Sequence, residues 1–171
     1  LFDVLPRFHL CNKIVDLNKI DYFLLPELLE KFQIETLNYL NIPEHKRLSS
    51  KKYRHIKAEK LISTDHPVVI TQNPTYDIMN MPVWISKWLK VKFLNQIMKN
   101  DEKNIKKIYI DRSDTTSKQP PQRSISNEDE VKKYLTKNNF TSVKLHELKF
   151  IDQVQLFYNA ECIVGLHGGG F

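Results

Sequence analysis

The chain has 171 residues, of which 41% are hydrophobic and 11% aromatic, enough for a folded core. Lys and Arg outnumber Asp and Glu by 26 to 20, and this net charge of +6 favours anionic partners. The excess is mostly lysine, spread along the chain without interleaved aromatic residues, which argues against a nucleic-acid-binding protein. Cys11 and Cys162 share no pairing motif, so we expect free thiols in a reducing, cytoplasmic compartment. Signal-peptide and membrane-spanning patterns are absent from the sequence.

The amino-terminal part predicts helices separated by short strands. Apolar residues at helical spacing predict helices over residues 2–16, with a bend at Pro6, over 27–38 and over 83–98. The apolar face of the third helix is expected to hold Trp84, Trp88, Val91 and Leu94. Short apolar runs predict strands at residues 21–25, 58–63 and 68–71, and the polar residues 41–57 predict turns.

The carboxyl-terminal part predicts strictly alternating strands and helices. Strands are expected at residues 107–110, 143–145 and 161–164, the last one buried, and helices at 128–137 and 150–158. Asn127 is expected to cap the first of these helices, with Glu130 three residues further on. The order β-α-β-α-β predicts a parallel sheet, half of a doubly wound α/β domain. We therefore expect an amino-terminal domain over residues 1–98, a charged linker over 99–106 and a second domain over 107–171.

The four glycines of the chain all fall within its last seven residues, directly after the third predicted strand. A glycine-rich turn at the end of a strand exposes backbone N–H groups that can bind an anion such as phosphate. The spacing matches neither the dinucleotide fingerprint nor the P-loop, and a tight turn without a ligand would use the same residues. The turn consists of Gly165, Leu166, His167, Gly168, Gly169, Gly170 and Phe171.

Two of the five arginines lie in the loop after the strand at 107–110. A guanidinium matches phosphate oxygens with paired donors, so Arg112 and Arg123 are candidates for binding a diphosphate. The alternative is that each pairs with a neighbouring carboxylate, Asp114 or Glu128, at the surface. Glu128 itself can either favour the helix dipole or accept hydrogen bonds from a ribose.

Eight segments of the chain carry a resemblance to a known family. The later four cover residues 108–112, 123–128, 157–161 and 165–170. The earlier four cover residues 2–7, 41–44, 65–67 and 82–84. The later four closely resemble glycosyltransferase family 61, and the earlier four resemble that family's amino-terminal landmarks. Two positions depart from the family pattern, because Asp111 stands where a serine is usual and Leu166 where a proline is usual.

The resemblance implies a GT-B-like enzyme with two Rossmann-like domains facing across a cleft, both incomplete in a chain that we expect to be a fragment open at both ends. It implies an inverting, metal-independent transfer of a sugar from a nucleoside-diphosphate donor, without a cofactor. It further implies a glycan or lipid-linked glycan acceptor in surface or capsular polysaccharide synthesis, with peripheral association at the inner face of the membrane. The implied diphosphate-binding residues are Arg112, Arg123, Gly165, His167, Gly168, Gly169 and Gly170, and the implied nucleoside-binding residues are Asn127 and Glu128.

An inverting transfer needs a general base for the acceptor hydroxyl, and we expect it in the first domain. The candidates are Asp3, Asp65 and His66. Asp3 can instead pair with Arg7 one helical turn away, and His66 can simply orient its loop before Pro67. His167 can stabilise the leaving diphosphate or hydrogen-bond within its own loop. The alternative function is a non-catalytic Rossmann-like module that binds polysaccharide or another anionic ligand.

Overall fold

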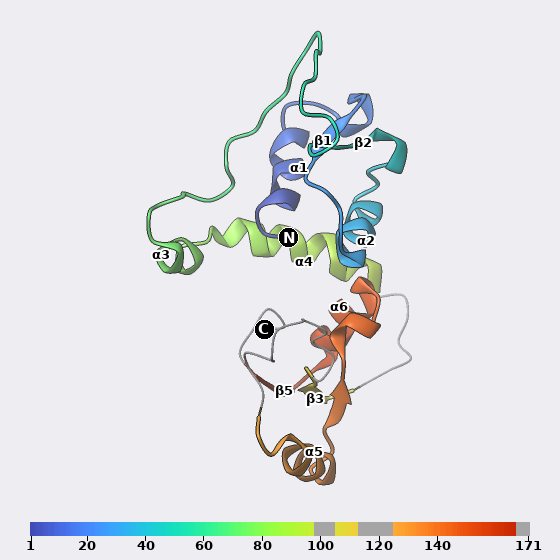
Figure 1. The fold of residues 1–171 in the computed structure, drawn as a ribbon, viewed down its shortest axis with the longest axis vertical. Coiled ribbons are helices and arrows are strands. Elements are labelled where there is room, and N and C mark those ends of the chain that lie inside the picture. The colour runs from blue at the N-terminus through green and yellow to red at the C-terminus, as the bar shows by residue number, and fades with distance from the viewer. Residues whose placement is uncertain (98–104, 113–124, 167–171) are drawn as a thin grey trace. The chain divides into compact units, whose positions relative to one another are not determined.

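The computed structural model describes residues 1–97, 105–112 and 125–166. It divides into two compact units, Leu1–Asn95 and Gln96–Phe171, each of which contains a small parallel sheet and helices (Figure 1). The protein therefore has mixed α/β architecture, as the sequence predicts. No helix within the described residues is long and apolar enough to span a bilayer.

Unit 1 packs helices against a two-stranded sheet. Its elements are α1 (Val4–Asn12), β1 (Phe23–Leu25), α2 (Lys31–Tyr39), β2 (Arg47–Ser49), α3 (Pro74–Met79) and α4 (Val83–Ile97), with one-turn helices η1 (Leu17–Lys19) and η2 (Glu44–Lys46). Strands β1 and β2 are parallel, with Leu24 opposite Leu48. Phe8 of α1 contacts Phe23 of β1 with ring centroids 5.4 Å apart.

The predicted helices of unit 1 are confirmed, with shifted ends that have local causes. Helix α2 begins four residues later than predicted because the Gln33 side chain accepts hydrogen bonds from the backbone N–H groups of Leu29 and Glu30, at 2.8 and 2.9 Å. This contact forms a capping box, which satisfies N–H groups at the helix start. Pro6 lies in the first turn of α1, where a missing N–H costs no hydrogen bond.

The buried stripe of α4 differs from the predicted one. Ile85, Phe93 and Ile97 are buried, with at most 5% exposure, whereas Val91 is 59% exposed. The spacing of apolar residues in the sequence does not distinguish between two adjacent stripes along α4, because the helix is apolar around much of its circumference.

The strand predictions for residues 58–63 and 68–71 are wrong, because residues 50–73 form a connection without helix or strand. Leu61 and Val69 are 85% and 80% exposed, and no described strand pairs with these runs. A short apolar run becomes a strand only where a neighbour supplies hydrogen bonds.

Two elements were missed in unit 1. Strand β2 falls inside the segment predicted as turns and forms because β1 pairs with it. Helix α3 does have a sequence signal: Pro74 is its first residue, and the Asn73 side chain accepts from the N–H groups of Thr75 and Tyr76 at 3.1 and 3.2 Å.

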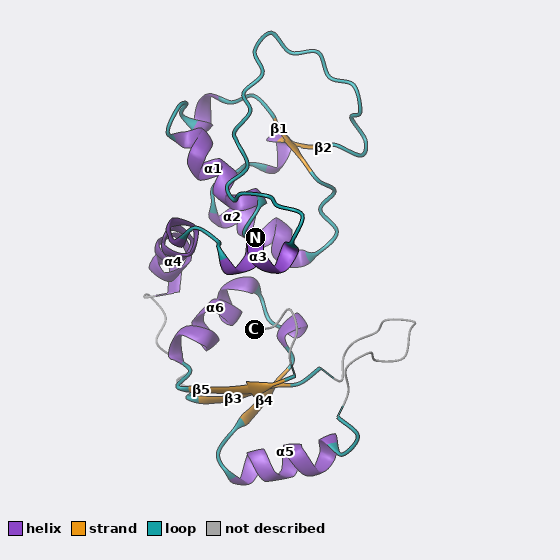
Figure 2. Cartoon of the chain, turned by 90° about the vertical axis from the view of Figure 1, so that its left-hand side faces the viewer, coloured by secondary structure: helices purple, strands orange, loops and turns teal. Residues whose placement is uncertain are grey.

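Unit 2 has the predicted alternation of strands and helices. Its elements are β3 (Lys107–Ile110), α5 (Glu128–Lys137), β4 (Thr141–Val143), the one-turn helix η3 (Leu145–Glu147), α6 (Phe150–Asn159) and β5 (Cys162–Gly165). The sheet has the order β4-β3-β5, both pairs parallel, and α5 and α6 cover its opposite faces (Figure 2). The central strand β3 supplies the buried core residues Ile108, Tyr109 and Ile110.

Two local expectations for unit 2 are wrong. Strand β5 is partly exposed, and Cys162 is exposed, because β5 is an edge strand of the described sheet. The Asn127 side chain does not cap α5. Its amide donates instead to the Glu130 carboxylate at 3.2 Å, while three acidic residues in the first turn favour the helix dipole.

Candidate functional site

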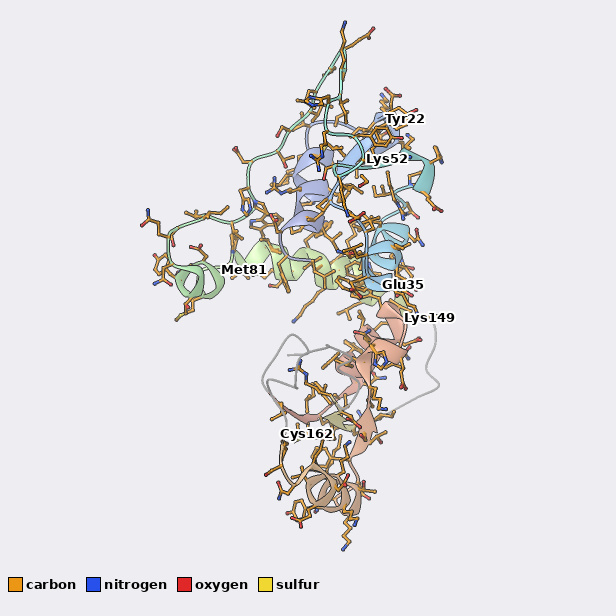
Figure 3. All side chains as sticks on the ribbon, viewed as in Figure 1. Tyr22, Glu35, Lys52, Met81, Lys149 and Cys162 are labelled. Carbon is orange, nitrogen blue, oxygen red and sulfur yellow. The ribbon has the colours of Figure 1, made fainter. Side chains whose placement is uncertain are left out.

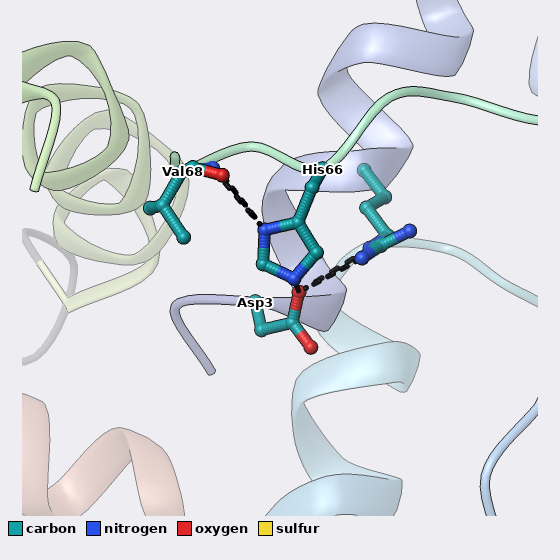
Figure 4. A network of polar contacts seen from close by, with 4 residues as sticks. Asp3, His66 and Val68 are labelled. Carbon is teal, nitrogen blue, oxygen red and sulfur yellow. Dashed lines mark hydrogen bonds and ion pairs between the residues drawn. The ribbon is translucent and has the colours of Figure 1, made fainter. Parts of the chain in front are cut away.

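Asp3 and His66, two of the three predicted general-base candidates, lie in contact in unit 1. The distance from His66 Nε2 to Asp3 Oδ1 is 2.9 Å, although the two residues are far apart in the sequence (Figure 4). Asp3 stands at the start of α1 but makes no side-chain cap bond there. The third candidate, Asp65, is exposed and lies outside this described network.

Arg7 also contacts Asp3. Its Nε and Nη2 atoms donate to Asp3 Oδ1 at 3.3 and 3.1 Å, so the i,i+4 alternative for Asp3 exists together with the His66 contact. Within the described residues, the polar contacts of Asp3 thus all fall on Oδ1. The other carboxylate oxygen points away from His66 in Figure 4, and the Asp3 side chain is 58% exposed. Asp3 therefore has one oriented oxygen and one that solvent or a substrate can reach.

The backbone of Val68 orients the other nitrogen of His66. Nδ1 lies 3.0 Å from the Val68 carbonyl oxygen and 3.4 Å from the Val68 nitrogen. A protonated imidazole would donate to both Val68 and Asp3, whereas a neutral one with hydrogen on Nε2 would donate to Asp3 and accept from Val68. The ring thus has a hydrogen-bonding partner on each nitrogen, which fixes its orientation.

Unit 2 holds a second polar cluster, where the chain leaves the central strand. Asp111 directly follows β3 and its side chain is 8% exposed. Its Oδ2 atom lies 2.9 Å from Lys132 Nζ and accepts from the Ser142 hydroxyl at 3.3 Å. The Asp111 N–H also donates to the Val143 carbonyl at 2.9 Å, which extends the β3–β4 pairing by one residue. The backbone ladder and the ion pair together fix this carboxylate.

Lys132 joins Asp111 to Glu128. Its Nζ lies 3.3 Å from Glu128 Oε1, and the same oxygen accepts from the Tyr109 hydroxyl at 3.1 Å. The hydrogen bond to Asp111 is the main reason that the pKa of Lys132 is raised. Burial, followed by the hydrogen bond to Glu128, raises the pKa of Tyr109 to about 12. At neutral pH the cluster thus holds a lysine cation between two carboxylates, with a neutral tyrosine.

Sequence reasoning missed Lys132, Tyr109 and Ser142 as members of this cluster. The four-residue spacing from Glu128 to Lys132 was a usable signal, because such pairs face each other on a helix. The contacts of Asp111 with Lys132 and Ser142 depend on which helix covers the sheet and on which strand adjoins β3. Only the tertiary structure supplies that information.

The predicted diphosphate-binding residues fall partly within the described chain. Arg112 follows Asp111 and is partly exposed, and Gly165 is the last residue of β5. Gly165 pairs in register with Ile110, so the loops that carry the two predicted anion-binding segments begin on adjacent parallel strands. Arg123, His167, Gly168, Gly169 and Gly170 lie outside the described residues. Asn127 and Glu128 stand at the start of α5.

The described residues include no group of three or more His, Cys, Asp or Glu side chains placed to hold a metal ion. Comparison with curated proteins and with solved structures gave no significant match. The sequence profile of the family described as Glycosyltransferase 61, in contrast, matches residues 1–171. That match spans both units, including the Asp3–His66 contact and the segment that leaves β3. The chain therefore belongs to glycosyltransferase family 61.

Proposed function

We propose that this glycosyltransferase takes its sugar from a nucleoside-diphosphate donor held by unit 2 and transfers it to a glycan hydroxyl with inversion at the anomeric carbon. In this reaction the acceptor oxygen attacks the anomeric carbon, the bond to the diphosphate breaks, and a base of the protein takes the hydroxyl proton. The proposal includes a GT-B arrangement, independence from metal ions and cofactors, and a role in surface or capsular polysaccharide synthesis on the cytoplasmic side of the membrane.

The pairing of Ile110 with Gly165 carries the proposal for the donor site. Ligands of parallel α/β sheets bind beyond the carboxyl ends of the strands. Adjacent strands β3 and β5 both run toward that edge, and each continues into a segment with anion-binding chemistry: Arg112 after β3, and the glycine-rich turn after β5. A guanidinium and backbone N–H groups are the donors that a leaving diphosphate requires.

Lys132 compensates a negative charge that would otherwise disfavour a diphosphate at this site. A carboxylate at Asp111 next to Arg112 would repel a diphosphate if it were unpaired. Lys132 contacts that carboxylate at 2.9 Å, so the charge beside Arg112 is compensated within the protein. The contact is thus compatible with a donor diphosphate at the end of β3, despite the departure from the family's serine.

We assign the general base to Asp3, with His66 and Arg7 as the residues that position it. Three donors converge on Oδ1, at 2.9 to 3.3 Å, which leaves Oδ2 to accept the proton of the acceptor hydroxyl. Asp65 has no part in this assignment.

Calorimetric titration of the chain with UDP, GDP, ADP and CDP tests the donor site. We expect one nucleotide to bind and Arg112→Ala to weaken it by about 1.5–3 kcal/mol, the range for hydrogen bonds to charged groups. Arg112→Lys should recover only part of the loss because it lacks the paired donors. The control is Arg54→Ala, an exposed arginine in unit 1. If the wild type and Arg112→Ala bind the nucleotide with equal affinity, Arg112 does not bind the diphosphate.

Turnover of the matching nucleotide sugar tests the base. Asp3→Asn should lower kcat by about 10²–10⁴-fold, the usual contribution of a general base, with donor affinity unchanged. His66→Gln should lower kcat less, and Asp65→Asn is the matched control with near-normal turnover. Activity should also persist in EDTA. Nucleotide binding without any transfer or hydrolysis would instead identify a non-catalytic binding module.

A further inference from the structure

The long connection between β2 and α3 concentrates the positive charge of the protein. Residues 51–60 contain five Lys and Arg side chains against one carboxylate, Glu59, so ten residues carry +4 of the chain's net +6. All ten are exposed. The lysines are spread along the chain, but this stretch holds a local excess of positive charge. We call residues 51–60 the basic segment.

Large apolar side chains are exposed in and next to the basic segment. Tyr53, Ile56 and Leu61 are 40%, 49% and 85% exposed. Lys52 Nζ lies 5.5 Å from the centroid of the Tyr53 ring, close enough for a cation–π contact. Apolar side chains are exposed elsewhere on this chain too, among them Ile14, Leu29 and Met79. In the basic segment they lie among cations, and a membrane interface accepts both the cations and the apolar groups.

The basic segment begins at a fixed point of unit 1. The Ser50 N–H donates to the Leu25 carbonyl at 2.8 Å, and the Tyr53 N–H donates to the Ser49 carbonyl at 2.9 Å. Lys51 forms an ion pair with Glu27 at 2.8 Å. Beyond this point the connection leaves β2 as a long teal trace and later returns toward α1, which His66 contacts through Asp3, and α3 (Figure 1). Figure 3 labels Lys52 near the start of the connection. Backbone bonds to both strands of the sheet therefore hold the near end of the segment.

We propose that the basic segment docks unit 1 on an anionic lipid bilayer surface. Lysine is a compact point charge that suits a diffuse array of headgroups, and Arg54 is the only arginine in the segment. Tyr53, Ile56 and Leu61 would enter the interfacial layer between the headgroups. Base stacking by a nucleic acid would need several aromatic residues, and the segment has only Tyr53. The proposal rests on the membrane placement in the proposed function, for which it names the segment, and it is independent of the donor site and of the base.

Co-sedimentation with vesicles tests the proposal. We expect the chain to bind phosphatidylcholine vesicles that contain about one-third phosphatidylglycerol at low salt and to be released as salt screens the charges. Each Lys or Arg near such a surface strengthens binding by roughly fivefold, so removing four should weaken it by about 600-fold when the four contributions add. The test variant replaces with Gln the residues Lys52, Arg54, Lys57 and Lys60. The matched control replaces with Gln four other exposed lysines, Lys87, Lys90, Lys133 and Lys149.

A local probe separates docking from general charge attraction. The emission of Tyr53→Trp, after subtraction of the two native tryptophans, should shift to the blue with phosphatidylglycerol vesicles and not with pure phosphatidylcholine. Equal weakening by the test and control variants overturns the proposal. Absence of binding at low salt does so too, as does tighter binding to soluble dextran sulfate than to vesicles of equal charge. Transfer to a soluble acceptor should be unchanged in the test variant, whatever the outcome for the donor site.

Discussion

Replacing Lys132 with methionine should destabilise unit 2 by about 3 kcal/mol. Lys132 contacts two carboxylates, and Asp111 is only 8% exposed, so the substitution leaves a buried charge without its cation. Breaking a buried ion pair from one side costs about 3–5 kcal/mol. We expect the lower end of this range because the Lys132 side chain retains 26% exposure and water screens part of the interaction.

The double variant Asp111→Ser with Lys132→Met should be more stable than Lys132→Met alone. Removing the carboxylate takes away the charge that Lys132 compensates, and serine keeps a polar group beside Ser142. A double-mutant cycle then measures the coupling between the two residues. Lys133→Met is the matched control, because Lys133 is exposed on the same helix and should change stability by less than about 0.5 kcal/mol.

The assay must report on unit 2. Both tryptophans of the chain, Trp84 and Trp88, lie in unit 1, so tryptophan emission would miss the event. Urea unfolding followed by far-ultraviolet circular dichroism, together with hydrogen exchange of peptides from β3 and α5, measures the relevant free energy. If Lys132→Met changes the stability of unit 2 no more than Lys133→Met does, Asp111 does not depend on its contact with Lys132.

Three further predictions concern titration and reactivity. The raised pKa of Tyr109, about 12 against an unfolded value near 10, stabilises the fold below pH 10. Up to about 3 kcal/mol of this stability should be lost as the pH rises toward 12, and Tyr109→Phe should flatten the loss in urea unfolding. The pKa of His9 is lowered by burial and by Lys13 and Lys92. The neutral ring therefore contributes fully to the stability of the fold above about pH 6.5, and this stability is lost as the pH falls through the pKa of His9 in the folded state. His9→Phe should remove that acid-side slope, and an unchanged slope would contradict it. Burial raises the pKa of Cys11, so N-ethylmaleimide should modify exposed Cys162 first, as peptide mass spectrometry would show.

The sequence by itself determined the alternation of unit 2 and much of its detail. The boundaries of α5 agree to the residue, and the three strands lie within two residues of their predicted ends. Each of these elements has a clear hydrophobic pattern in the sequence. Strands that alternate with helices through short connections form a parallel sheet. The same reasoning named Asp3 and the adjacent Asp65 and His66 as candidates for the base, and the structure brings Asp3 and His66 into contact.

The tertiary structure alone decided which of the apolar segments pair with a neighbouring strand. Residues 58–63 and 68–71 look like strands but have no described neighbour, whereas Arg47–Ser49 looks like a turn and becomes β2 beside β1. Lys132 neutralises Asp111 because α5 packs against the sheet where β3 ends, a contact that no spacing in the sequence encodes. Strand pairing and ion pairing are long-range interactions. Their free energy depends on which segments meet, and local propensity does not contain that information.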